Sequence, residues 1–145
     1  MEKKQQERKS AEDELLVRLV REEDFVELSE WFSKRKWPVP PGPDILPKTG
    51  YVAVKGDEML SVAWLYPTTT PVAFVDWMAT NPESGTLGLR SLVKVLDHIK
   101  RISDPHVSRL MFLTPNDKLT KFAEKRMKFK KTEKANILIW SRGSK

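Results

Sequence analysis

The chain has no cysteine and only two histidines among its 145 residues. Without cysteine it can form neither a disulfide framework nor a zinc site built on thiolates. His98 and His106 have no partner at metal-ligand spacing, so we expect both to be solvated and the protein to bind no metal. A cysteine-free chain also fits a reducing compartment, and we expect a cytoplasmic protein.

Long apolar runs are missing as well. No window approaches the roughly 18 apolar residues that a membrane span needs, and the N-terminal sequence MEKKQQERKSAEDE lacks the apolar core of a secretory signal. We therefore expect no membrane association. Residues 1–14 are almost wholly polar and are expected to form a flexible arm. Residues 15–145 are long enough to bury a core and are expected to form a single domain.

Charge is unevenly distributed. Lys and Arg total 26 against 20 acidic residues, which gives a net charge of +6. This balance favours an anionic partner such as nucleic acid or a coenzyme phosphate. The segment 118–134, KLTKFAEKRMKFKKTEK, is rich in Lys and Arg and is the best candidate for an electropositive face. A solvated helix face is the more common explanation of such a run.

Hydrophobic spacing predicts alternating strands and helices. Strands are expected at 15–20, 51–54, 59–66, 72–80, 107–113 and 135–141. Helices are expected to begin at 21–24 and to cover 87–102 and 116–128. The order is β-α-loop-β-β-β-α-β-α-β, an antiparallel meander followed by β-α-β crossovers. It predicts an α/β (α+β) fold, with a mixed, mostly antiparallel sheet flanked by helices on both faces.

Residues 74–96, FVDWMATNPESGTLGLRSLVKVL, contain a strand, a loop with Gly85 and Gly88, and a helix in that order. We expect the loop amides and the helix N-terminus to point outward, where the helix dipole favours negative charge. This segment is therefore the expected place for a phosphate-bearing cofactor.

With the element order, four segments resemble the GNAT family of N-acetyltransferases over about residues 15–140. They are VREEDFVELSEWF, YVAVKGDEMLSVAWLY, AFVDWMATNPESGTLGLRSLVKVL and LTPNDKLTKFAEKRMKF. The family binds acetyl-coenzyme A in a splayed gap between its fourth and fifth strands, with the pyrophosphate on the loop amides. The resemblance implies an acyltransferase that moves an acetyl group from acetyl-coenzyme A to an amine acceptor.

The chain departs from the family pattern at several positions. The family loop reads Arg/Gln-x-x-Gly-x-Gly/Ala, and Gly85, Gly88 and Arg90 fall at its three places. The leading basic residue is thus absent, and Arg90 replaces a small residue. Arg90 either obstructs the phosphates or binds one, since a guanidinium suits phosphate geometry. The Tyr that often protonates the leaving thiolate would fall near Ala123, and the tight Gly-Phe end of that helix is replaced by residues 127–129.

Asp76 is the only acid in the fourth expected strand and is our candidate base or water-positioning residue. The alternative is a carboxylate at the sheet surface or in a structural ion pair. The resemblance implies that main-chain amides of 78–80 polarise the acetyl carbonyl. The expected cofactor contacts are Met78, Ala79, Thr80, Gly85, Gly88, Arg90 and Asn116. Asn116 is otherwise a helix cap, because Asn caps helices regardless of function.

The acceptor is expected to enter between the 51–66 hairpin and the segment 37–47, WPVPPGPDILP, whose five prolines exclude a regular element. That segment is either substrate-facing or a packed crossing. Trp37 and Tyr66 are the candidate acceptor contacts. Most of the five tryptophans should be core residues, whereas Trp37 is placed to stack on a ring or peptide.

Two further hypotheses remain open. The fold can be retained without acetyl transfer, as a binding or structural module whose anionic partner is nucleic acid, as in phage proteins that look like GNAT domains with eroded motifs. The two functions can also be joined in a GNAT-like modification of a nucleic-acid target. The sequence is compatible with a monomer or a homodimer.

Overall fold

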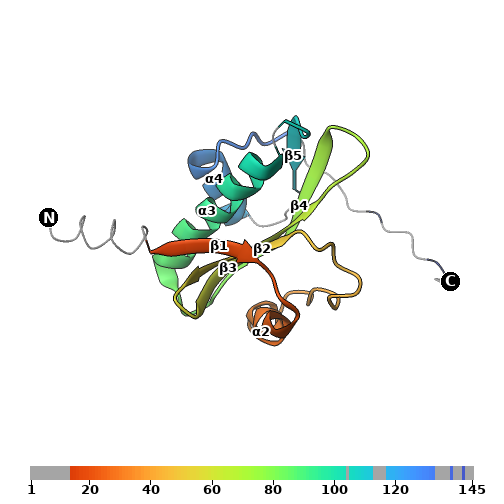
Figure 1. Ribbon diagram of the computed structural model, residues 1–145. Helices are drawn as coiled ribbons and strands as arrows, with labels where there is room; N and C mark the ends of the chain where they lie inside the picture. The colour runs from red at the N-terminus through yellow and green to blue at the C-terminus, as the bar shows by residue number, and fades with distance from the viewer. Residues whose placement is uncertain (1–13, 104, 113–116, 133–137, 139–141, 143–145) are drawn as a thin grey trace, which may run out of the picture. The chain divides into compact units, whose positions relative to one another are not determined.

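The computed structural model describes residues 14–103, 105–112, 117–132, 138 and 142 (Figure 1). They belong to two units, Met1–Leu113 and Thr114–Lys145, each of which is treated by itself. The first unit contains strands β1 (Leu15–Leu19), β2 (Gly50–Lys55), β3 (Glu58–Tyr66), β4 (Val72–Thr80) and β5 (Arg109–Met111). It also contains the 3-10 turn η1 (Glu22–Asp24) and helices α2 (Phe25–Lys34) and α3 (Gly85–Ser103), whereas α4 (Asp117–Arg126) lies in the second unit.

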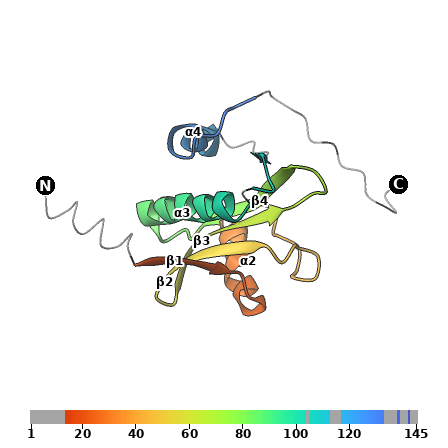
Figure 2. The ribbon, with the colours of Figure 1, turned by 45° about the horizontal axis from the view of Figure 1, so that its top comes forward.

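The five strands form one sheet in the order β1-β2-β3-β4-β5. Neighbours from β1 to β4 are antiparallel, and β5 pairs with β4 in parallel. Helices α2 and α3 cover opposite faces of this sheet (Figure 2). The predicted α+β fold, with a mixed and mostly antiparallel sheet and helices on both faces, is confirmed.

Some boundaries differ from those expected. α3 begins at Gly85 and not at residue 87. The spacing of apolar residues could not show this start, because the first two residues of the helix, Gly85 and Thr86, are not apolar. β5 covers only Arg109–Met111 of the expected strand 107–113. The predicted strand 135–141 lies almost entirely outside the described residues, as does Asn116, the expected start of α4.

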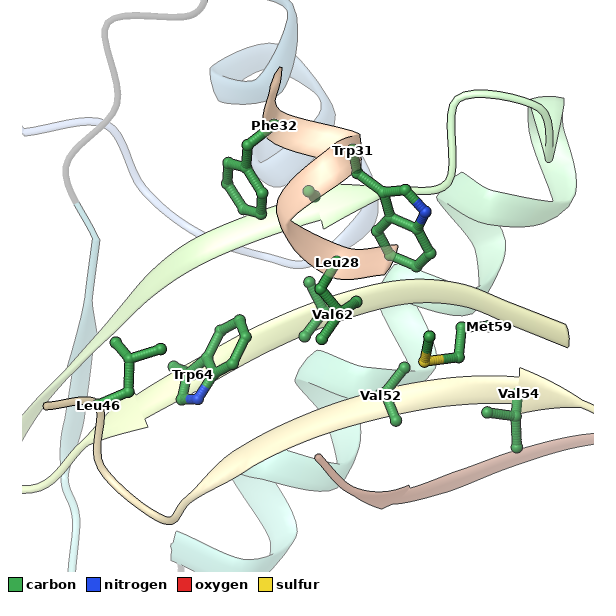
Figure 3. Packing of buried hydrophobic residues seen from close by; sticks show 10 residues of the cluster. Leu28, Trp31, Phe32, Leu46, Val52, Val54, Met59, Val62 and Trp64 are labelled. Carbon is green, nitrogen blue, oxygen red and sulfur yellow. The ribbon is translucent and has the colours of Figure 1, made fainter. Parts of the chain in front are cut away.

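The core on the α2 face forms around large side chains of α2 and the central strands (Figure 3). Leu28, Trp31 and Phe32 follow helical spacing and pack against Val62 and Trp64 of β3, and all five are at most 3% exposed. Trp31 and Trp64 are therefore core residues, as expected for most of the tryptophans. Burial of side chains this large fixes α2 across β3 and β4.

A buried polar link holds α3 to the other face of the sheet. Ser61 of β3 and Ser91 of α3 are fully buried, with their hydroxyl oxygens 2.6 Å apart. Ser91 donates its single hydroxyl proton to the carbonyl of Gly88 at 2.7 Å. Ser61 must therefore be the donor of the pair, and both buried hydroxyls are satisfied. This link sets the position of the first turns of α3 relative to β3.

His98 is less solvated than expected. It is half-buried on α3, and its ring centroid lies 5.0 Å from that of Tyr51 on β2. Burial, followed by the charge of Arg101, lowers the pKa of His98. Burial also raises the pKa of Tyr51. The polar residues around His98 in the sequence concealed that it packs against the sheet.

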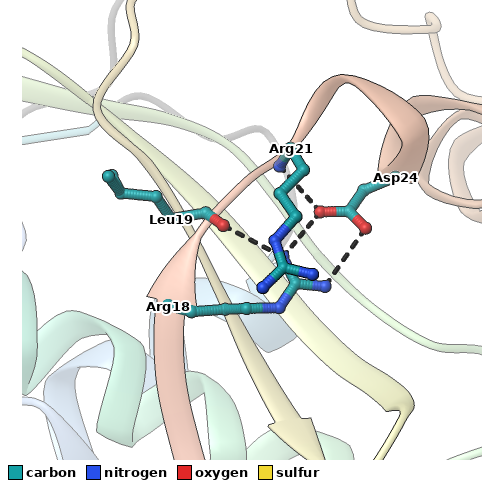
Figure 4. Close-up of polar contacts among 4 residues, drawn as sticks. All are labelled: Arg18, Leu19, Arg21 and Asp24. Carbon is teal, nitrogen blue, oxygen red and sulfur yellow. Dashed lines mark hydrogen bonds and ion pairs between the residues drawn. The ribbon is translucent and has the colours of Figure 1, made fainter.

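Asp24 joins β1 to the start of α2 (Figure 4). Its carboxylate accepts hydrogen bonds from both Nη atoms of Arg18, at 2.7 and 3.1 Å, and from the Arg21 amide at 2.7 Å. Burial alone would raise the pKa of Asp24, but the bonds from Arg18 and Arg21 and the charges of both residues lower it overall. The ionised form is thus stabilised by folding.

In the part of the chain that the structure describes, no helix is long and apolar enough to cross a membrane.

We expect Asp24→Asn to reduce the free energy of unfolding by about 2 kcal/mol at neutral pH, since it removes a charge-assisted pair of hydrogen bonds. The pKa of Asp24 is lowered in the folded protein. Its contribution is therefore present above its unfolded pKa of about 3.9 and is lost as the pH falls through the folded pKa.

Urea unfolding of both proteins at neutral and acidic pH measures this effect. The difference in stability should be largest at neutral pH and should shrink in acid. Asp97→Asn, at an exposed position on α3, is the matched control and should leave stability unchanged. A constant difference at all pH values would contradict the assignment.

Candidate functional site

The C-terminal half of β4 has an open edge within the described residues. β5 pairs with β4 only from Val72 to Phe74, and the ladder ends at Phe74–Met111. On the other edge, the Asn81 amide donates to the Leu60 carbonyl of β3 at 2.8 Å. Amides alternate between the two edges of a strand, so the Thr80 amide is directed to the open edge and the Ala79 amide towards β3.

A bulge distorts β4 at Trp77. The pairing with β3 shifts between Val62 and Trp64, and Trp77 has φ 52°, a left-handed conformation that is rare for an aromatic residue. The Trp77 amide donates to its own neighbour, the Asp76 carboxylate, at 2.7 Å. Asp76 pairs with Trp64, whose side chain belongs to the α2-side core, so Asp76 projects from the α2 face and is exposed.

Tyr66 lies near Asp76 in the regular part of the pairing, and the bulge turns Trp77 towards the same face of the sheet. The Trp77 indole donates to the Tyr66 hydroxyl at 2.9 Å, which leaves the hydroxyl proton of Tyr66 free to be donated elsewhere. Burial and the nearby charge of Asp76 raise the pKa of Tyr66, and the bond from Trp77 offsets part of that rise. Two of the predicted residues therefore meet here, an exposed carboxylate and a phenol that stays protonated at neutral pH.

The loop between β4 and α3 is organised by Asn81. Its side-chain oxygen accepts from the Glu83 amide at 3.0 Å, and its backbone carbonyl accepts from the Ser84 amide at 3.0 Å. The expectation that all loop amides point outward is thus wrong, because Asn81 engages two of them. The first three amides of α3, from Gly85 to Leu87, have no carbonyl one turn earlier in the helix and remain the candidate anion donors.

Gly88 is needed for packing. A Cβ atom at this position would lie 2.0 Å from Ser84 Oγ and 3.2 Å from Thr80 Cβ. Ser84 Oγ is itself held by a 2.6 Å bond to the Asn81 carbonyl. The close approach that Gly88 allows is therefore used by Ser84 and by the end of β4, which seats the first turn of α3 beside Thr80.

The other predicted cofactor contacts are placed as follows. Gly85 is the first residue of α3, with φ 56°. Met78 is half-buried in β4, and the side chain of Ala79 belongs to the α2-side core. Arg90 is half-buried in α3. Asn116 lies outside the described residues, so its role as a contact or a cap stays a prediction.

The C-terminus of α2 positions Trp37. The amide of Trp37 donates to the Phe32 carbonyl and that of Lys36 to the Ser33 carbonyl, both at 3.0 Å. Lys36 has φ 58°. These two bonds form a Schellman motif, which usually has a glycine at the position of Lys36. The motif is usually accompanied by a hydrophobic contact between the positions that Trp37 and Phe32 occupy here. Their rings lie 6.1 Å apart, and Trp37 is still 39% exposed.

Arg35 is a candidate site residue that the sequence did not reveal. Its guanidinium lies 5.0 Å from the centre of the Trp37 ring and donates to Thr80 Oγ1 at 3.0 Å. The sequence shows it only as the middle of the basic run Lys34-Arg35-Lys36, which reads as a solvated helix end. The contact with Thr80 depends on the crossing of α2 over the sheet, which local sequence does not specify.

The proline-rich segment is partly packed. Pro40 and Leu46 are buried, Leu46 as part of the α2-side core, whereas Val39 and Ile45 are exposed. The segment is therefore at least a packed crossing. Its predicted contact with an acceptor stays a prediction.

The second unit contributes two observations. α4 carries Ala123, so this helix has no tyrosine at the position discussed above. Lys128 has φ 59°, so a left-handed residue follows α4 although no glycine stands there. The basic side chains of Lys121, Lys125 and Arg126 are exposed.

The donors around the end of β4 fit a phosphate-bearing ligand such as coenzyme A. They are the Thr80 amide, the first amides of α3 and the guanidinium of Arg35. All of these groups can donate hydrogen bonds to phosphate oxygens. Within the described residues, no group of three or more His, Asp or Glu could hold a metal ion.

No protein-family model and no curated protein matches the sequence. Solved structures do match. An acetyltransferase from Trypanosoma brucei covers 87% of this chain and 99% of its own, with a TM-score of 0.59 and 17% identity. An aminoglycoside acetyltransferase from an uncultured soil metagenomic sample covers 89% and 97%, with a TM-score of 0.61 and 12% identity.

A protein from Mycobacterium tuberculosis, solved in complex with coenzyme A, covers 85% of this chain and 76% of its own, with a TM-score of 0.58 and 16% identity. These matches extend over nearly the whole chain. The chain therefore has the GNAT fold, as the resemblance to that family implied.

We expect Gly88→Ala to lower the free energy of unfolding by about 1–3 kcal/mol, because the added methyl group displaces Ser84 from its bond to Asn81. Thermal and urea denaturation measure the change. Gly42→Ala is the matched control: no atom lies within 4 Å of the added carbon there, so stability should not change. Equal stability of the two variants would show that the loop is not packed as described.

We expect Lys36→Gly to raise the free energy of unfolding by about 1 kcal/mol, because it relieves the left-handed strain of a residue with a Cβ atom. Lys34→Gly removes the same side chain within α2 and should lower stability by about 1 kcal/mol. Opposite signs in urea denaturation support the Schellman geometry. A loss of stability in both variants would contradict it.

Proposed function

We propose that this protein is an acyltransferase that moves an acetyl group from acetyl-coenzyme A to an amine acceptor. The observation that carries the proposal is the open edge of β4 beside the N-terminus of α3. Backbone donors at this place suit a ligand that has both an extended arm and phosphates. The coenzyme A complex of the Mycobacterium tuberculosis protein, which shares the fold, supports the same choice.

In this proposal the coenzyme contacts Thr80 and Met78 along the open edge and the amides of Gly85 to Leu87 at the start of α3. When bound, acetyl-coenzyme A supplies a thioester as the activated acyl group. The amide of Ala79 is directed towards β3 and is not available to the coenzyme. Gly88 acts indirectly, because it lets α3 pack against Thr80. Arg90 and Asn116 complete the set of proposed contacts.

Asp76 is the proposed base. Its carboxylate is exposed on the α2 face, so an incoming amine can reach it. It removes or relays a proton from the amine, either directly or through one water molecule. Tyr66 stays protonated beside it and donates a hydrogen bond to the acceptor, while the exposed face of Trp37 provides a surface for stacking. The acceptor thus approaches from the α2 face.

A second candidate is a GNAT-like module that binds an anionic partner, such as nucleic acid, without acetyl transfer. The observation that favours it is the use of the Glu83 and Ser84 amides by Asn81, which leaves fewer donors for a pyrophosphate. The basic surface of α4 would then supply phosphate contacts. A modifier of nucleic acid would combine both activities.

Isothermal titration with acetyl-coenzyme A tests the first candidate. We expect binding. Absence of a heat of binding up to about 1 mM ligand would remove the proposal, since a Kd of about 1 mM already corresponds to a binding free energy of only about 4 kcal/mol. Salt-dependent binding to DNA or RNA without coenzyme binding would select the second candidate. Mass shifts on nucleic acid after incubation with acetyl-coenzyme A would identify a modifier.

Asp76→Asn tests the role of the carboxylate. The amide oxygen of Asn can still accept the bond from the Trp77 amide, so the bulge is retained while the base is lost. We expect the release of free thiol with a panel of primary amines to fall by about 100-fold or more, with acetyl-coenzyme A affinity unchanged. Asp97→Asn serves as the charge-matched control. Full activity of Asp76→Asn would exclude Asp76 as the base.

A further inference from the structure

Within the described part of the chain, the contacts of the Arg35 guanidinium are with neutral groups. It donates to Thr80 Oγ1 at 3.0 Å and to the Trp31 carbonyl at 3.2 Å, and it lies over the Trp37 ring. Among the described residues, no carboxylate forms an ion pair with Arg35. A guanidinium has five N–H donors, and these contacts use only part of them.

Arg35 is also partly withdrawn from water. Burial lowers its pKa, although a guanidinium remains charged at neutral pH. A partly desolvated charge without a counter-ion is unfavourable, and an anion that binds to it regains that free energy. Lys34 and Lys36 flank Arg35 in the chain but are exposed. Arg35 is therefore the basic residue of this run that is positioned for a specific anion.

Arg35 lies near the open edge of β4. Arg35 is the C-cap of α2, which lies on one face of the sheet. Thr80 pairs with Ser61, whose side chain contacts α3, so the side chain of Thr80 lies on the other face. The bond to Thr80 Oγ1 places the guanidinium at the last residue of β4, where β5 does not pair. Thr80 in turn lies against Gly88 in the first turn of α3. The charge of Arg35 is thus close to the start of α3, with the side chain of Thr80 between them.

We propose that Arg35 binds a phosphate group of the coenzyme and supplies, from the end of α2, the positive charge that the β4–α3 loop lacks. This inference rests on the proposed function. The planar guanidinium can engage phosphate oxygens with two parallel bonds, which a lysine cannot do. The stack on Trp37 and the bond to Thr80 hold it in one orientation beforehand, so little side-chain freedom is lost when the phosphate binds.

The same contacts allow an opposite role. If the Arg35–Thr80 bond only closed the edge of β4, the coenzyme would have to break it, and removal of Arg35 would strengthen binding. An anionic group on the acceptor is a second source of the same chemistry. In that case Arg35 would affect acceptor binding and leave the coenzyme affinity unchanged. The two alternatives and the proposal therefore predict different results in one experiment.

The experiment is isothermal titration of acetyl-coenzyme A into the wild type, Arg35→Ala, Arg35→Lys and Lys34→Ala, without any acceptor. We expect Arg35→Ala to weaken binding by about 10- to 100-fold, because a charge-assisted pair of bonds is lost. Arg35→Lys should recover part of the affinity. Lys34→Ala removes an exposed charge next in sequence and should stay within about 2-fold of the wild type.

Repetition of the titrations at several salt concentrations gives a second measure, since the salt dependence should be smaller for Arg35→Ala than for Lys34→Ala. Urea denaturation of each variant verifies that the fold is retained. An unchanged or higher affinity of Arg35→Ala, with normal binding by the wild type, would overturn the role of Arg35 alone. Absence of binding by the wild type would overturn the proposed function and this inference together.

Discussion

The constraint on which the rest of the site depends is the short pairing between β4 and β5 within the described residues. The two strands pair over only three positions, and beyond Phe74 the edge of β4 carries no strand within the described residues. A strand edge in this state exposes unpaired amides and carbonyls, which proteins normally cover. Here the edge is bordered by the bulge at Trp77, by Arg35 and by the first turn of α3. These features lie together at the end of β4.

Packing on both faces keeps that edge in place. On one face, the aromatic side chains of α2 bury against β3, and the end of α2 then carries Trp37 and Arg35 to the sheet edge. On the other face, the Ser61–Ser91 link and the absence of a side chain at Gly88 let α3 approach β3 and Thr80. The Arg18–Asp24 pair joins β1 to the start of α2 and so fixes where the aromatic layer begins. The site is therefore a result of how two helices are seated on one sheet.

The fold could be predicted from the sequence, because the period of apolar residues distinguishes the strands from α2 and α3 and the order of elements restricts the topology. The region of the site could be predicted as well, since glycines and an Asn-Pro turn after β4 mark the start of a helix. The roles of single residues could not. Gly88 was expected to contact the cofactor, but the space beside it is taken by Ser84. Arg35 was indistinguishable from its neighbours Lys34 and Lys36, because its contact with Thr80 joins residues far apart in the chain.

We infer that a phosphate-bearing coenzyme binds along the open edge of β4 and at the start of α3. Nitrogen–proton NMR spectra recorded during titration with coenzyme A test this claim most directly, since they report each amide and also the Arg35 side chain. If the coenzyme binds there, the largest shifts will occur at Thr80, at the amides of Gly85 to Leu87 and at Arg35 Nε. Shifts confined to the basic residues of α4, or none at saturating coenzyme, would contradict it.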